Sequence, residues 1–109
     1  MVKLIELLKK KQGLSLDEFS KYWKETWAPL YLGTGPGISR YVQNVALKLS
    51  EHEQAYDGIA ESWWDDLESI RRAEQYLKSE DGKVLRDKLN EFIDFRQLVA
   101  ILVEERVII

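Results

Sequence analysis

The stretch VKLIELLKKKQGLSLDEFSKYWKETWAPL, residues 2–30, decides the fold because it runs from a strand through a turn into a helix. Residues 2–9 are apolar at both odd and even positions, which favours a strand, and Gly13 supplies the turn. Ser15 and Glu18 have the spacing of a capping box, in which each side chain accepts a hydrogen bond from a backbone N–H of the other's turn. This spacing predicts that a helix starts at Ser15.

The predicted helix carries one apolar face. The residues on this face recur at helical spacing: Leu16, Phe19, Trp23, Thr26, Trp27 and Leu30. Pro29 has no N–H to donate and disfavours helix at Ala28, so we expect the helix to end or kink there. The glycines between residues 33 and 37 follow a helix and precede a strand, which is not the context of a phosphate-binding loop.

The rest of the chain continues the alternation of strands and helices. The predicted strands are 38–49, 59–64 and 98–103, and helical patterns cover 67–77 and 84–93. Asp65 and Glu68 repeat the capping-box spacing, with Asp65 as the cap. The order strand, helix, strand, strand, helix, strand predicts a ferredoxin-like β-α-β-β-α-β fold of the α+β class, with an antiparallel sheet and one domain over residues 1–109.

Helices in this arrangement cover only one face of the sheet. A second face open to water would require strands that alternate apolar and polar residues. The first strand, 2–9, and the last strand, 98–103, are apolar on both faces. We therefore expect a second copy of the sheet to cover the open side as a homodimer, since two-fold pairing is the commonest assembly. The alternative is a monomer whose long side chains shield that face.

Composition narrows the classes of partner and site. The net charge of −3, from 16 basic and 19 acidic residues, gives no basic excess to bind nucleic acid. Cysteine is absent, so disulfides, thiolate metal sites and a cysteine nucleophile are excluded, and a cytoplasmic location is expected. No apolar run has the length of a signal peptide core or a membrane span, so no membrane partner is expected.

Four segments together resemble EthD-type domains. They are KLIELLKKKQGLSLDEFSKYWKETWAPL (3–30), GISRYVQNVAL (37–47), YDGIAESWWDDLES (56–69) and LVEERVI (102–108). The resemblance covers nearly the whole chain in the same order and implies membership of the dimeric α+β barrel superfamily. It therefore implies two ferredoxin-like sheets paired into one barrel, and an association with the degradation of organic compounds.

One position departs from the pattern that this resemblance implies. EthD-type domains usually have Trp-x-x-x-His-x-Pro, whereas this chain has Trp23, Trp27 and Pro29 at the three fixed positions. An indole has one N–H donor and no basic nitrogen at neutral pH. Trp27 is therefore neither a general base nor a metal ligand, and any family role of the histidine is not expected here.

Two carboxylates interrupt apolar strands. Glu6 and Glu61 lie on the first and third strands, which are adjacent and central in a ferredoxin-like sheet. A partly buried carboxylate has a raised pKa and suits general acid–base catalysis, and we take Glu61, with Tyr41 nearby, as the catalytic candidate. The alternative is that each carboxylate pairs with a basic or backbone group, or reaches water at the rim of the barrel.

Polar residues also lie in the middle of the second predicted strand. Tyr41 and Gln43 point to one face and Asn44 to the other. Tyr41 and Gln43 are candidates for holding a ligand carbonyl or hydroxyl group by hydrogen bonds. The alternative is ordinary pairing with neighbouring strands on the sheet surface.

Aromatic residues are the third candidate group. Tyr22, Trp23, Trp27 and Trp63 are expected to line a flat apolar pocket between helix and sheet. Trp63 and Trp64 are neighbours and point to opposite faces of the sheet. The alternative is that the aromatic stripe is core, and Trp27 in the place of an imidazole would leave a small or closed pocket.

No metal or cofactor site is expected, since the only histidine, His52, lies in a polar loop without ligand partners at metal spacing. Three functions remain. The first is a homodimer that binds a small apolar or aromatic organic molecule, as an accessory to the degradation of organic compounds. The second is a cofactor-independent enzyme of the monooxygenase, dehydratase or decarboxylase type that acts on aromatic or polyketide-like substrates through Glu61 and Tyr41. The third is a purely structural homodimer.

Overall fold

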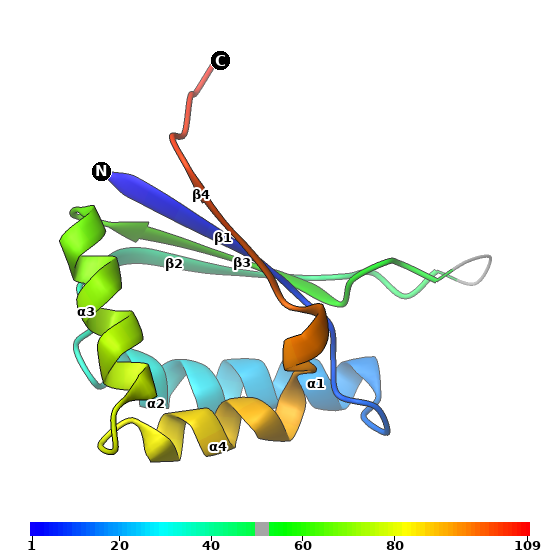
Figure 1. The fold of residues 1–109 in the computed structure, drawn as a ribbon. Helices are drawn as coiled ribbons and strands as arrows, with labels where there is room; N and C mark the ends of the chain where they lie inside the picture. Colours follow the sequence, from blue (N-terminus) through cyan, green and yellow to red (C-terminus); the bar gives the residue numbers. More distant parts are fainter. Residues whose placement is uncertain (50–52) are drawn as a thin grey trace.

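The computed structural model describes residues 1–49 and 53–109, so His52 lies outside the described residues. The elements in chain order are β1 (Val2–Leu8), α1 (Leu16–Tyr22), the π-helical segment η1 (Trp23–Trp27), α2 (Ala28–Leu32), β2 (Ile38–Val45), β3 (Gly58–Trp64), α3 (Leu67–Lys78), α4 (Lys83–Phe92), the 3-10 turn η2 (Phe95–Gln97) and β4 (Val99–Val103). Figure 1 shows their arrangement.

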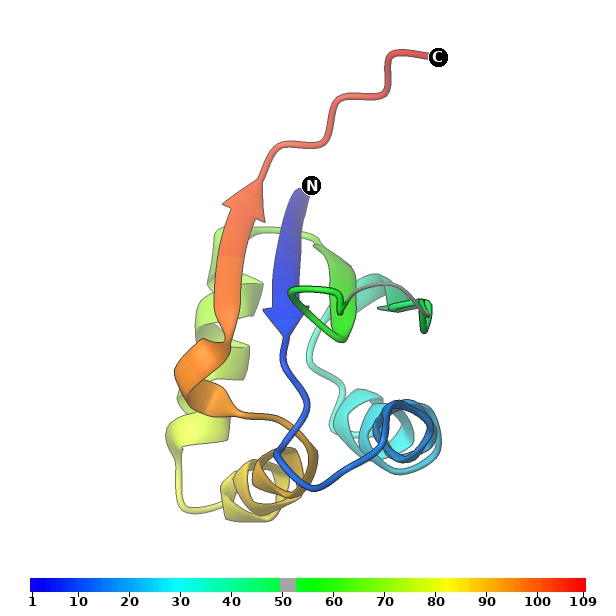
Figure 2. The ribbon, with the colours of Figure 1, turned by 90° about the vertical axis from the view of Figure 1, so that its right-hand side faces the viewer.

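The sheet has the strand order β2-β3-β1-β4, and each neighbouring pair is antiparallel. The helices pack on one side of this sheet, and the two views of Figures 1 and 2 agree on that arrangement. The predicted α+β, ferredoxin-like fold with β1 and β3 at its centre is therefore confirmed. The strand predicted over 38–49 is shorter than expected, because β2 ends at Val45.

The first helix begins as predicted but does not end at Ala28. Ser15 and Glu18 form both hydrogen bonds of the capping box, at 3.0 and 2.9 Å. The chain then continues through η1, where the Ala28 N–H bonds to the carbonyl of Trp23, five residues earlier. Pro29 lies in the first turn of α2, where a missing N–H is tolerated. Of the predicted end or kink at Ala28, the end is not observed, because the backbone stays helical through Pro29. The regular α-helical hydrogen bonding is nevertheless interrupted by the π-helical segment directly before Ala28.

The cap of the second long helix also differs from the prediction by one residue. Asp66, not Asp65, accepts a hydrogen bond from the Ser69 N–H at 2.8 Å, and its backbone is extended as expected of an N-cap. α3 therefore begins at Leu67. The two predicted helical patterns, 67–77 and 84–93, are separate helices, since α3 ends at Lys78 and α4 begins at Lys83, directly after Gly82.

The core lies between the helices and the helix-facing side of the sheet, called here the helix face. Phe19 and Trp23 pack at 5.5 Å between ring centroids, and Phe19 and Phe92 at 5.7 Å. These rings are almost fully buried. On β3, Gly58 gives them room: a methyl group there would lie 2.8 Å from Cζ3 of Trp23 and 3.2 Å from the ring of Phe19. The central strand thus needs small side chains beneath the aromatic stripe.

The opposite side of the sheet, called here the open face, is also rich in apolar residues. Cross-strand register places the following apolar side chains on it: Ile5, Leu7, Val42, Ile59, Val99, Ile101 and Val103. No helix of the described chain covers this face (Figure 2). The pattern that predicted two apolar faces is therefore present in the structure.

Substitution of Gly58 by Ala tests this packing. Because the added methyl group overlaps Trp23 and Phe19, we expect the free energy of unfolding to fall by about 1–3 kcal/mol in urea titrations. The exposed Val84→Ala on α4 is the control and is expected to change stability by less than about 0.5 kcal/mol. Equal stability of Gly58→Ala and the wild type would contradict the packing described here.

Candidate functional site

A cavity of about 80 Å³ lies between the helix face of the sheet and the aromatic stripe. Its sheet side includes Glu6 on β1, Ala60 and Ser62 on β3 and Tyr41 on β2, and its helical side includes Trp23, Trp27 and Tyr31. Apolar residues of the second half of the chain complete it, among them Leu77, Leu89, Phe92 and Leu98. The cavity is therefore mostly apolar with a few polar groups, as small-molecule sites usually are.

The cavity exists because β3 presents small residues to the helices. Ala60 and Ser62 lie directly opposite residues of both flanking strands, so they form the centre of the cavity floor. The Ser62 hydroxyl accepts a hydrogen bond from Nε1 of Trp64 at 2.8 Å, which satisfies the indole donor. Larger side chains at these two positions would fill the space.

Glu6 is the carboxylate of this cavity. It lies opposite Ala60 on one side and Ala100 on the other. Within the described residues it has no hydrogen-bonded or ion-paired partner. Burial raises the pKa of the Glu6 carboxyl, and the nearby Glu74 carboxylate adds to the effect. Glu6 therefore has the perturbed environment that the sequence suggested for Glu61.

Tyr41 contributes one of the hydroxyl groups of the cavity, beside those of Tyr31 and Ser62. Its oxygen accepts a hydrogen bond from Nε1 of Trp23 at 3.0 Å. Gln43 acts indirectly, because its side-chain amide donates to the Trp23 carbonyl at 3.1 Å and so holds the π-helical segment against the sheet. Burial raises the pKa of the Tyr41 phenol, although the N–H groups of Gln43, Trp23 and Trp27 oppose the rise. Tyr41 therefore stays protonated at neutral pH and keeps its own O–H as a donor.

Tyr31 is a cavity residue that the sequence analysis missed. Its ring stacks on Trp27 with 5.1 Å between centroids and 13° between planes. Burial raises the pKa of the Tyr31 phenol, and the charge of Glu6 raises it further. The signal was present, since Trp23, Trp27 and Tyr31 recur every four residues, but the helix was expected to end before Tyr31.

The cavity that Trp27 helps to line is small. The cavity of about 80 Å³ is roughly half of the ~150 Å³ that accommodates a benzene ring in an engineered protein core. The small pocket that was expected if an indole occupied the histidine position is therefore observed. A ligand that fits without rearrangement has only a few non-hydrogen atoms.

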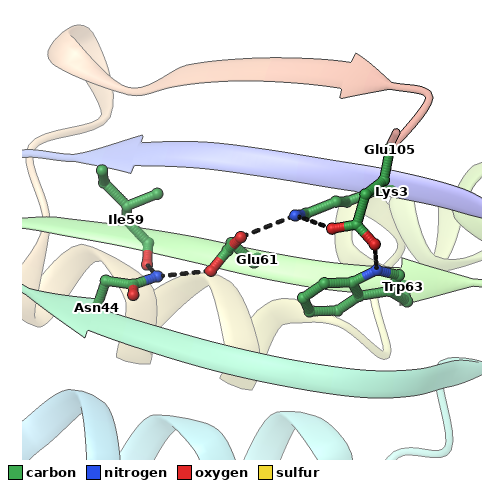
Figure 3. Close-up of polar contacts among 6 residues, drawn as sticks. All are labelled: Lys3, Asn44, Ile59, Glu61, Trp63 and Glu105. Atoms are coloured by element: carbon green, nitrogen blue, oxygen red, sulfur yellow. Dashed lines mark hydrogen bonds and ion pairs between the residues drawn. The ribbon is translucent and has the colours of Figure 1, made fainter. Parts of the chain in front are cut away.

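Glu61 lies on the open face, on the other side of the sheet from Tyr41. Its carboxylate bonds to Nζ of Lys3 at 2.8 Å and accepts from the Asn44 amide at 2.9 Å (Figure 3). The Lys3 ammonium, and then the Asn44 amide, hold the pKa of Glu61 below its ordinary value. The expectation that Tyr41 lies near Glu61 in one site is therefore not met within a chain, and Glu61 takes the structural alternative of pairing with a basic group.

Trp63 belongs to the same polar cluster on the open face. Lys3 lies 4.5 Å from the centre of its ring and also bonds to Glu105 at 2.7 Å, while Nε1 of Trp63 donates to Glu105 at 3.2 Å (Figure 3). Glu105 and then Glu61 raise the pKa of Lys3. Trp63 therefore does not line the cavity, whereas its neighbour Trp64 does.

Tyr22 lies outside the cavity as well. Its hydroxyl donates to the Glu91 carboxylate at the protein surface, and its ring packs at 5.0 Å from that of Phe92. Of the predicted ligand residues, the structure thus brings together Trp23, Trp27 and Tyr41, with Gln43 beside them.

In the described part of the chain, no group of three His, Cys, Asp or Glu side chains is placed to hold a metal ion. No helix there has the length and hydropathy needed to cross a membrane.

The two carboxylates predict opposite effects of pH on stability. Because the folded pKa of Glu6 is raised, its ionisation opposes folding once the pH exceeds the unfolded value of about 4. We therefore expect Glu6→Gln to be more stable than the wild type at pH 7, and this gain to disappear below about pH 4. Urea titrations at several pH values and one protein concentration measure the effect.

Glu61→Gln is the matched comparison. Because the folded pKa of Glu61 is lowered, its contribution is present above the unfolded value of about 4 and is lost as the pH falls through the folded value. We expect this variant to be less stable than the wild type at pH 7, with the difference disappearing in acid. The same sign for both variants would contradict the assignment of the two carboxylates to different environments.

Comparisons with known proteins agree with this fold. A crystal structure of an ethyl tert-butyl ether D (EthD) family protein from Bacillus halodurans is 24% identical, covers 97% of this chain and 99% of that chain, and gives a TM-score of 0.69. A dimeric protein of unknown function and ferredoxin-like fold from Bacteroides fragilis is 17% identical, with coverage of 95% of each chain and a TM-score of 0.63.

SnoaB, a cofactor-independent oxygenase from Streptomyces nogalater, is 16% identical, with coverage of 97% of this chain and 93% of that chain and a TM-score of 0.62. A comparison with curated protein sequences gives no match. The model of the EthD domain matches residues 11–96, which is most of the chain. The chain therefore belongs to the EthD family.

Proposed function

We propose that this protein binds a small, neutral, mostly apolar organic molecule in the cavity beneath Trp23 and Trp27. The observation that carries the proposal is the pair of polar groups in this apolar space: the carboxylate of Glu6 and the O–H of Tyr41. A ligand gains affinity from the apolar walls and orientation from such groups. The size of the cavity favours molecules near the size of a short ketone or ether.

The charge of the cavity supports a neutral ligand. The described residues that line it include no lysine or arginine to balance an anion. A carboxylate or phosphate would instead face the acidic group of Glu6, and like charges at close range are unfavourable in a desolvated site. The ether in the name of the Bacillus halodurans relative's family is also neutral, although it is larger than a ligand that fits the cavity without rearrangement.

A second candidate function is that of a cofactor-independent enzyme. The fold that this chain shares with SnoaB, a cofactor-independent oxygenase, is compatible with it. In this case we propose Glu6 as the acid–base group in place of Glu61, because Glu61 is ion-paired to Lys3 on the other face. Tyr41 keeps the role proposed for it from the sequence.

We further propose that the protein functions as a homodimer paired through the open face. Apolar side chains line this face, and Ile101 at its edge strand is 48% exposed in the single chain. Two solved proteins of the same fold, from Bacteroides fragilis and Thermobifida fusca, are described as dimeric. Burial of such a face provides the stabilisation that a small domain with a modest core requires.

Binding can be tested with the indole N–H signals of ¹⁵N-labelled protein, assigned through single Trp→Phe variants. Ethyl tert-butyl ether, acetone and phenol are the probes. We expect a saturable shift of the Trp23 and Trp27 signals with at least one probe, and no shift of Trp63, because Trp63 lies on the open face. Perturbation of all the indoles alike, or of none, would contradict binding in the cavity and favour a purely structural homodimer.

A variant that fills the cavity sharpens this test. In Ala60→Leu the added side chain occupies the centre of the cavity floor, so the probe-dependent shifts should weaken by tenfold or more in apparent affinity, about 1.4 kcal/mol. Ala55→Leu makes the same change at an exposed loop position and should leave the shifts unchanged.

Dimerisation can be tested with Ile101→Asp. Because burial of an unpaired carboxylate between two sheets is costly, we expect this variant to shift from twice the mass of one chain to the mass of one chain in light scattering at micromolar concentration. The control variant Val84→Asp introduces the same group on α4, away from the open face of the sheet, at a residue that is 58% exposed. This variant should remain dimeric. A wild-type protein that is monomeric and fully folded under these conditions would contradict the proposed dimer.

A further inference from the structure

We propose that Glu6 and Tyr41 form a proton-transfer pair for an enolisable carbonyl compound: Glu6 removes a proton from the carbon next to the carbonyl group, and Tyr41 donates a hydrogen bond to the carbonyl oxygen. This inference rests on the proposed binding of a small neutral molecule in the cavity and names the class of that molecule.

The acceptor of the pair is the Glu6 carboxylate. It faces the cavity and, within the described residues, is neither ion-paired nor hydrogen-bonded. By contrast, Glu61 and Glu105 on the open face share the ammonium of Lys3. A carboxylate in an apolar site without a compensating cation is a stronger base than one in water. Glu6 is thus suited to take up a proton from a weak carbon acid.

The donor of the pair is the Tyr41 hydroxyl. Because its oxygen already accepts the indole N–H of Trp23, its hydrogen is free to point into the cavity. The bond from Trp23 also polarises the phenol toward donation, since chains of hydrogen bonds strengthen one another. The indole of Trp23 is held in turn by packing against Phe19 and by the bond from Gln43 to its backbone. This donor is therefore preorganised.

The register of the sheet sets the separation of the two groups. Glu6 lies opposite Ala60, and Tyr41 lies opposite Ser62, so β3 separates them. Two strand spacings place the β1 and β2 backbones roughly 10 Å apart. Both side chains line the same cavity, together with the small Ala60 and Ser62 of the strand between them. A small molecule in this cavity would therefore have an acceptor and a donor among its neighbours.

The chemistry that fits this arrangement is a proton shift without oxidation or reduction. The C–H bond next to the carbonyl breaks, its proton passes to the Glu6 carboxylate, and its electron pair forms the C=C bond of an enolate. The negative charge moves to the oxygen that accepts the Tyr41 O–H. If the proton on Glu6 is replaced by a deuteron from solvent before it returns to the same carbon, the result is exchange. Return of a proton to a conjugated carbon gives an isomer.

Deuterium exchange into acetone tests the inference, because acetone has four non-hydrogen atoms and suits the small cavity. Loss of its proton NMR signal in D₂O is followed with wild-type protein and with Glu6→Gln, Tyr41→Phe and Glu61→Gln. Circular dichroism verifies that each variant is folded. We expect the protein-dependent exchange rate to fall by about 10²-fold or more in Glu6→Gln and by at least about tenfold in Tyr41→Phe. The exposed Glu80→Gln is the control and should exchange like the wild type.

A pH profile supplies a second readout. With the wild type, the rate should rise with pH through a midpoint above the ordinary range of a glutamate carboxyl, and this rise should be absent in Glu6→Gln. Exchange that survives in Glu6→Gln, or that is lost in Glu61→Gln instead, would overturn the inference.

The indole N–H signals recorded on the same samples separate the two proposals. Saturable shifts of Trp23 and Trp27 by acetone without exchange would overturn the proton-transfer pair and leave the binding function standing. If acetone causes neither shifts nor exchange, the pair is rejected. If the other probes also leave the cavity indoles unchanged, the proposed binding function is rejected with it.

Discussion

The packing of indoles against a central strand of small residues determines the rest of this structure. Trp23 lies so close to Gly58 that a single methyl group there would overlap it. Further along β3, Ala60 and Ser62 are small as well, and there a cavity lined by Trp27 and Tyr31 lies between the helices and the sheet. Core and candidate site are thus parts of one interface between the aromatic stripe and β3.

The same sheet gives two carboxylates opposite properties. Glu6 and Glu61 are on adjacent central strands, yet the pleat directs one to the helix face and the other to the open face. On the open face a cation and an amide stabilise the charge of Glu61, whereas on the helix face burial destabilises the charge of Glu6. The difference between the two carboxylates comes from Lys3, which lies on the open face and pairs with Glu61. Glu6 has no such cation beside it among the described residues, so it is the carboxylate that we propose as a base.

The sequence was sufficient for the element order, the capping box at Ser15, the two apolar faces and the small size of a pocket with Trp27 in it. It was not sufficient to choose between Glu6 and Glu61. Where a strand has apolar residues at both odd and even positions, periodicity does not show which of its faces packs against the helices. It also missed Tyr31, since the rule that proline ends a helix does not anticipate a π-helical turn that carries the apolar stripe past Pro29.

The tryptophan at the family's usual histidine position changes which group can accept a proton, not whether one can. Trp23 and Trp27 contribute N–H donors and no base. The described lining residues that titrate are Glu6, Tyr31 and Tyr41, and burial raises the pKa of both phenols, so they remain donors at neutral pH. Any acid–base chemistry in this cavity must therefore pass through Glu6. Among the described lining residues no imidazole or other cation stands beside that carboxylate, and this isolation is the basis of the proposed proton transfer.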